Sequence, residues 1–127
     1  MEGEKGFTLI ETLIAVALVG LISVALIVAL ATASKVLIIA DERTTAESLA
    51  RSQMEYVKNQ TYDDVNEPPE YSLLSNIPDG YSIEVTAERL DPEGDGSGDD
   101  DGLQKITVTV EHHSEETVTL EGYKADR

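Results

Sequence analysis

The chain has 127 residues, of which 25 are acidic and nine are basic, so its formal net charge is −16 at pH 7. A chain this acidic argues against nucleic-acid binding, because phosphate contacts need a basic surface. Because it has no cysteine, disulfides, thiol nucleophiles and thiolate metal sites are excluded. The charge is also segregated: residues 61–127 hold 18 acids and four bases, whereas residues 12–34 hold no charge.

Residues 7–34 form an apolar segment that reads FTLIETLIAVALVGLISVALIVALATAS. Its uncharged run has 23 residues, more than the roughly 20 with which a helix crosses a bilayer core. A secretory signal peptide fits poorly, since its apolar run is about 7–15 residues long and its start is basic. A plain single-pass anchor leaves Glu11 unexplained, because a lone carboxylate in hydrocarbon is costly. We therefore expect a transmembrane helix over residues 7–34 that carries a functional carboxylate.

The residues at the start of this segment carry a resemblance. The run Lys5-Gly6-Phe7-Thr8-Leu9-Ile10-Glu11, followed by an uninterrupted apolar helix, resembles the class III signal of type IV pilins and type II secretion pseudopilins. The resemblance implies that residues 1–6 are a leader peptide, that a prepilin peptidase cuts between Gly6 and Phe7, and that Phe7 is then N-methylated. It also implies a homo-oligomer in a helical filament, built by inner-membrane assembly machinery, with Glu11 as an assembly residue.

Cleavage would create an α-amino group on Phe7, with a reference pKa of roughly 8. On a helix, Phe7 and Glu11 would be i and i+4 neighbours, so this amine could pair with Glu11 in the same chain. The carboxylate could also pair with the amine of an adjacent subunit, and only that pairing sets the register between subunits. We hypothesise that Glu11 governs incorporation through the intermolecular pair.

The charges that flank the apolar segment predict its orientation. Lys5 precedes the segment and should stay cytoplasmic, while the acidic carboxyl-terminal part crosses the membrane. We therefore expect the precursor in the cytoplasmic membrane, in contact with lipid, as a single-pass protein with its carboxyl-terminal part outside. The resemblance implies a cell-surface filament after assembly.

Residues 35–59 predict an amphipathic continuation of the helix, because they contain strong helix formers and neither glycine nor proline. Apolar residues recur there at spacings of three and four, which makes one stripe: Ala46, Leu49, Ala50, Met54 and Val57. The stripe needs a cover, and the carboxyl-terminal segment is the available partner.

Residues 60–80 break the helix and form the connection to the strands, the αβ loop. Pro68-Pro69 and Pro78-Asp79-Gly80 are turn signals, since proline fixes φ and glycine tolerates positive φ. A structureless loop of 21 residues is long, so we expect a short turn packed on the helix around Leu73, Leu74 and Ile77.

Residues 81–127 predict an antiparallel sheet. Apolar and polar residues alternate over 81–90, 104–112 and 116–123, which is typical of half-buried strands. The inward-facing set is Tyr81, Ile83, Val85, Ala87, Ile106, Val108, Val110, Val118 and Leu120. The predicted fold is therefore α+β, with a long amino-terminal helix packed against about three antiparallel strands in a pilin-like arrangement.

Between the first two strands, residues 91–102 form an acidic, glycine-rich loop. Oxygen donors occupy alternate positions, as in the first half of a calcium loop: Asp91, Glu93, Asp95, Ser97, Asp99 and Asp101. The position that closes an EF-hand loop is Gly102 here, so a neighbouring aspartate would have to complete the shell. The alternative is a solvated, flexible acidic loop that binds no metal.

These features together point to a structural protein rather than an enzyme. His112 and His113 are strand neighbours that should point to opposite faces as exposed side chains, and no phosphate-cradling loop is present. The leading interpretation is a structural subunit of a type IV pilus or pilus-like filament. The alternatives are a pseudopilin or minor pilin of a type II secretion-like system, and a membrane-anchored calcium-binding module that never polymerises.

Overall fold

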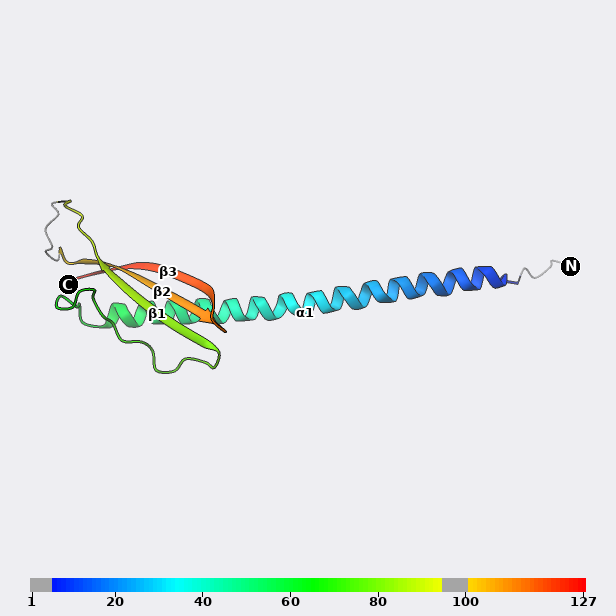
Figure 1. The fold of residues 1–127 in the computed structure, drawn as a ribbon, viewed down its shortest axis with the longest axis horizontal. Coiled ribbons are helices and arrows are strands. Elements are labelled where there is room, and N and C mark those ends of the chain that lie inside the picture. Colours follow the sequence, from blue (N-terminus) through cyan, green and yellow to red (C-terminus); the bar gives the residue numbers. More distant parts are fainter. Residues whose placement is uncertain (1–5, 95–100) are drawn as a thin grey trace. The chain divides into compact units, whose positions relative to one another are not determined.

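The computed structural model describes residues 6–94 and 101–127. Its elements follow in the order α1 (Leu9–Asn59), β1 (Tyr81–Arg89), β2 (Leu103–His112) and β3 (Glu115–Ala125), as Figure 1 shows. This confirms the predicted α+β class, a long amino-terminal helix with a three-stranded antiparallel sheet. The chain divides into two compact units, Met1–Ala40 and Asp41–Arg127, and α1 contributes residues to both.

The sheet has the order β1-β2-β3, and both neighbouring pairs are antiparallel. Val85 lies opposite Val108 in the first pair, and Val108 lies opposite Leu120 in the second, so apolar side chains share one face. The last two strands form a hairpin that turns at His113 and Ser114, which have φ values of 51° and 68°. Strands β1 and β3 are therefore the two edges of the sheet.

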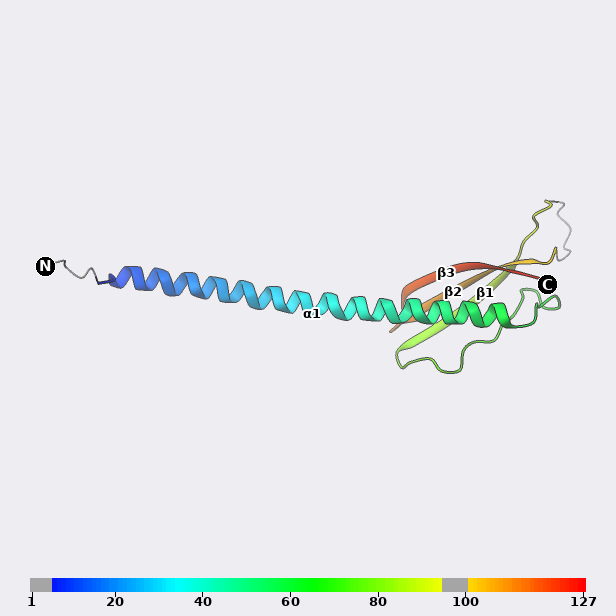
Figure 2. The ribbon, with the colours of Figure 1, turned by 180° about the vertical axis from the view of Figure 1, so that it is seen from behind.

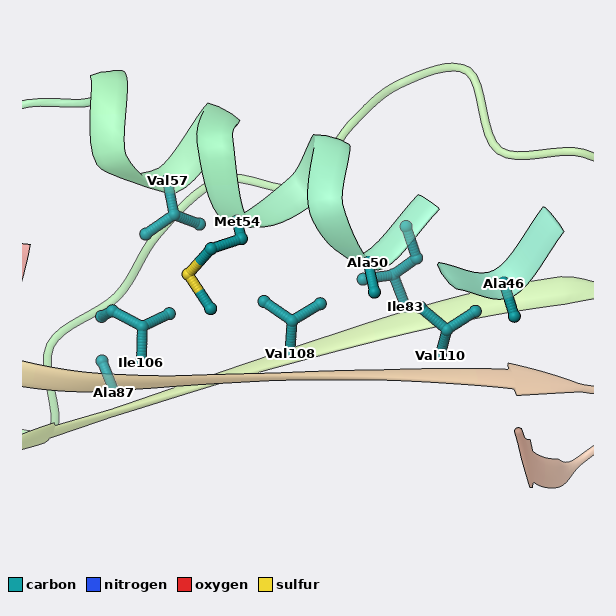
Figure 3. Packing of buried hydrophobic residues seen from close by; sticks show 9 residues of the cluster. All are labelled: Ala46, Ala50, Met54, Val57, Ile83, Ala87, Ile106, Val108 and Val110. Carbon is teal, nitrogen blue, oxygen red and sulfur yellow. The ribbon is translucent and has the colours of Figure 1, made fainter. Parts of the chain in front are cut away.

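The carboxyl-terminal half of α1 packs on this apolar face, as Figures 2 and 3 show. The buried cluster consists of Ala46, Ala50, Met54, Val57, Ile83, Ala87, Ile106, Val108 and Val110. Leu49 is partly buried against it, so the predicted stripe is confirmed. Every residue of this cluster belongs to the unit Asp41–Arg127, which therefore holds its own core.

The αβ loop differs from the prediction. Residues 60–80 contain no helical turn, and the side chain of Leu73 is exposed rather than packed on the helix. Ile77 does contact the buried cluster, and Tyr71 joins it there. The expected turn is therefore wrong, although the segment still contributes apolar contacts to the core.

Two glutamine side chains explain why this segment stays extended. Gln53, which is fully buried on α1, accepts a hydrogen bond from the N–H of Leu74 at 2.8 Å. Its Nε2 donates to the carbonyl oxygen of Ser72 at 3.0 Å. Gln60 accepts from the N–H of Ser72 at 2.9 Å and donates to the same carbonyl at 3.0 Å. The Gln53 amide pairs the loop backbone with α1, and the Gln60 amide pairs the start of the loop with Ser72. These backbone groups therefore have hydrogen-bond partners without a helical turn.

Asp63 organises the first part of the αβ loop. Its carboxylate accepts hydrogen bonds from the N–H groups of Val65 and Asn66 at 3.1 Å each, and of Glu70 at 2.8 Å. The side-chain amide of Asn66 donates to it at 2.9 Å. These donors hold the pKa of Asp63 well below its usual range, with the Glu70 N–H as the largest cause. The ionised form of Asp63 therefore stabilises the folded loop.

The carboxyl end of α1 is capped from far along the chain. Lys124, near the end of β3, directs its Nζ at the carbonyl oxygens of Val57, Lys58 and Gln60. Burial lowers the pKa of the Lys124 ammonium. The negative end of the helix dipole and the carbonyl acceptors favour its charged form.

Candidate functional site

The amino-terminal segment begins with residues that precede the helix. Gly6, Phe7 and Thr8 are non-helical, and α1 begins at Leu9. Thr8 acts as the N-cap, since its Oγ1 accepts a hydrogen bond from the N–H of Glu11 at 3.3 Å. The Gly6–Phe7 peptide bond therefore lies in non-helical backbone. The expected i,i+4 neighbourhood of Phe7 and Glu11 on one helix is wrong, because the cap excludes Phe7 from the helix.

Glu11 occupies the first turn of α1, where the positive end of the helix dipole favours a carboxylate. Its side chain is exposed, and in residues 6–94 and 101–127 no cation contacts it. The neighbouring apolar side chains are all more than half exposed: Leu9, Ile10, Leu13 and Ile14. In a membrane this carboxylate would lie among apolar groups, so it needs a cation from outside the described segment.

The unit Met1–Ala40 presents a continuous apolar surface. From Phe7 to Ile39, each exposed large apolar residue has at least 55% of its surface accessible. By length and composition, α1 is able to cross a membrane. The hydroxyls of Ser23, Thr32 and Ser34 donate to carbonyl oxygens four residues earlier, at 2.8, 2.9 and 3.0 Å. These bonds satisfy the hydroxyl donors without water, which suits an apolar environment.

The predicted calcium ligands fall only partly within the described residues, since three of the six lie outside them: Asp95, Ser97 and Asp99. Of the others, Asp91 accepts a hydrogen bond at its Oδ1 from the N–H of Gly94 at 2.6 Å, while Glu93 and Asp101 are exposed. Across residues 6–94 and 101–127, no group of three or more acidic or histidine side chains is placed to hold a metal ion. Calcium binding by this loop stays a prediction.

The two histidines depart from expectation. Instead of pointing to opposite faces, the rings of His112 and His113 lie with their centroids 4.1 Å apart. The His112 ring also lies 4.5 Å from the ring of Tyr81, and its Nδ1 is 3.5 Å from a carboxylate oxygen of Glu42. The prediction of two exposed histidines is wrong for His112, whose side chain is 16% exposed. The strand ends at His112, and the positive φ of His113 turns the next side chain back.

Sequence reasoning also missed two residues that shape the carboxyl-terminal unit, Gln53 and Lys124. Both lie on patterns that were visible in the sequence. Gln53 falls on the helix stripe between Ala50 and Val57, and Lys124 continues the inward alternation of Leu120. A polar residue on a buried stripe signals a specific hydrogen bond, because burial without one is costly.

Comparison with known families gives a match at the amino-terminal end of the chain. Residues 1–27 match the prokaryotic N-terminal methylation motif, which is the signature of type IV pilins and pseudopilins. This confirms the resemblance carried by residues 5–11, and it supports a type IV pilin-like or pseudopilin precursor. The signal implies processing by a prepilin peptidase and assembly into a pilus-like filament, and the apolar helix implies membrane anchoring of the precursor. Comparisons with curated proteins and with solved structures gave no match.

Proposed function

We propose that this chain is a structural subunit of a type IV pilus or pilus-like filament. The observation that carries the proposal is the pairing of the methylation motif at residues 1–27 with a helix whose apolar side chains stand exposed. Such a surface is stable in lipid, and it is equally stable against the apolar helices of other copies. The subunit can therefore leave the bilayer for a filament with little change in its surroundings.

Cleavage between Gly6 and Phe7 is the first step of this proposal. The bond lies in non-helical backbone next to the Thr8 cap, so a peptidase reaches it without unwinding α1. A β-carbon at Gly6 would have no described atom within 4 Å, so packing in this chain does not require glycine there. The requirement for Gly6 would come from the peptidase. The variant Gly6→Ala should therefore block processing and leave the carboxyl-terminal unit folded.

Glu11 directs incorporation by pairing with the Phe7 amine of an adjacent subunit. The exposed carboxylate and the non-helical position of Phe7 support this choice over a pair within one helix. The variant Glu11→Ala should be cleaved and held in the membrane but be absent from filaments. The matched control is Ser23→Ala, farther along the same helix, which should assemble normally. Normal assembly of Glu11→Ala would contradict this role.

The decisive experiment is mass spectrometry of filaments sheared from cells that produce the chain. The expected product is the 121-residue chain from Phe7 to Arg127 with a methylated amino terminus. Recovery of the chain solely as an unprocessed monomer in membranes would contradict the proposal and favour an anchored, non-polymerising module. Long surface filaments would favour a pilus, whereas loss of protein export on deletion, without such filaments, would favour a pseudopilus.

A further inference from the structure

The edge strand β3 does not follow α1 evenly along its length. At Gly122 the two elements touch, since a β-carbon there would lie 2.9 Å from the sulfur of Met54. Nearer the hairpin they separate, and a groove of about 340 Å³ opens beside Ala50, Val118 and Leu120. Val118 and Leu120 are only partly buried by the core, so they add apolar surface to a groove whose lining is otherwise mostly polar.

Basic side chains line the helix side of this groove and of the hollow that continues it past Leu120. They are Arg43, Arg51 and Lys58, three of the nine basic residues of the chain. Glu47 pairs with Arg43 at 3.5 Å, and Glu55 shares the rim. Within residues 6–94 and 101–127, no ion pair involves Arg51 or Lys58. Cations without acidic partners are unexpected in a chain with a net charge of −16.

The opposite edge of the sheet carries an excess of acidic side chains. Glu84 and Glu88 are exposed on β1. Glu67 of the αβ loop lines one shallow hollow with Glu88, Pro68 and Pro69, and it pairs with Arg89 at 3.9 Å. Arg89 holds the loop there, because its Nη2 donates to the carbonyl oxygens of Asp64 and Asn66 at 2.9 and 3.1 Å. The strand order places this acidic edge and the basic groove on opposite sides of the sheet.

We propose that the groove between α1 and β3 receives the acidic β1 edge of a second copy of this chain. The inference rests on the proposed function and names the contact between the carboxyl-terminal units. Copies of so acidic a chain repel one another, so they approach best where the cations lie. A contact between two grooves would place arginines against arginines, and a contact between two β1 edges would place glutamates against glutamates. When the groove of one copy binds the β1 edge of another, the pair still has one unoccupied groove and one unoccupied β1 edge. Contacts of this kind therefore extend into open helical assemblies.

Engineered cysteines test this contact directly, because the natural chain has none. Val118→Cys lies in the groove and Glu88→Cys lies on the acidic edge. In filaments from cells that produce both variants, mild oxidation should give a cross-linked dimer of the mature chain. Filaments of either variant alone should give none. A cross-link with Val118→Cys alone would show a symmetric contact and would overturn the inference.

Charge exchange provides the second readout. The variant Arg51→Glu should lower the amount of sheared filament about tenfold, since like charges now face each other. Adding Glu88→Arg should restore the amount. Adding instead Glu111→Arg, on the outward face of the central strand, restores the net charge without restoring the contact and should leave the amount low.

The outcomes separate this inference from the proposed function. If the unmodified chain forms filaments but neither the mixed cross-link nor the charge rescue is seen, the groove contact is wrong and the filament function stands. If the unmodified chain is never found in filaments, the proposed function fails and the contact fails with it.

Discussion

The Nζ of Lys124 donates a hydrogen bond to the carbonyl oxygen of Val57 at 2.9 Å, across 67 residues of sequence. The same ammonium donates to the carbonyl oxygens of Lys58 at 2.9 Å and Gln60 at 2.6 Å. The last carbonyls of a helix have no partner within it, so one side chain from β3 satisfies the end of α1. It thereby ties the last strand to the helix on which the sheet packs.

Removal of this cap should destabilise the carboxyl-terminal unit. In a fragment of residues 41–127, which keeps the whole buried cluster, Lys124→Met should lower the free energy of unfolding by about 2–3 kcal/mol. The loss arises because carbonyls at a partly buried helix end lose their charged donor. Urea denaturation measures it. The control is Lys105→Met, on the outward side of β2, where Lys105 pairs with Glu121 at 2.8 Å and the expected loss is below about 1 kcal/mol. Equal losses would contradict the capping role.

A side chain at Gly122 should press on Met54 of α1. The β-carbon of Gly122→Ala would lie 2.9 Å from the Met54 sulfur, and because this thioether is the flexible end of its side chain and is able to shift, the expected cost is about 1 kcal/mol of unfolding free energy. Shortening the opposing side chain with Met54→Val should make the added methyl group better tolerated. A double-mutant cycle by urea denaturation tests this coupling. Additive effects of the two changes would contradict direct contact.

The stability of the carboxyl-terminal unit should depend on pH through Asp63. Hydrogen bonds lower its pKa in the folded state from an ordinary value of 3.8. The ionised carboxylate therefore stabilises the fold fully above pH 3.8, and this stabilisation is lost as the pH falls through the folded-state pKa. The variant Asp63→Asn should melt at a lower temperature than the natural sequence at pH 7, and the difference should shrink in acid. Thermal melts from pH 7 to pH 2 measure this, and a constant difference would contradict it.

Calcium binding by residues 91–102 is tested by titration of the same fragment. Extracellular calcium modules bind at about 0.1–1 mM, so 10 mM calcium should stabilise a loop with a Kd of about 1 mM by about 1.4 kcal/mol. The stabilisation should appear as a raised melting temperature and a saturable heat. It should disappear in a variant with Asp99→Asn and Asp101→Asn. An absence of heat at 10 mM calcium would support the metal-free acidic loop instead.

The periodic parts of the fold could be predicted from the sequence. The strands lie within two residues of their expected ends, and the stripe from Ala46 to Val57 packs where expected. A spacing of 3.6 or 2 residues reports which side of an element is apolar, and that information is local. The αβ loop could not be predicted in this way, because its conformation depends on Gln53 and Gln60, which lie on or next to another element.

The sequence by itself determined the processing signal at residues 5–11, the apolar helix and the alternating strands, because each depends on residues that lie close together in the sequence. Only the tertiary structure decided that Lys124 closes α1, that His112 meets Glu42, and that β3 leaves a basic groove. These depend on which distant segments meet and at what separation. No local pattern encodes that distance, since it results from packing the whole sheet on the helix.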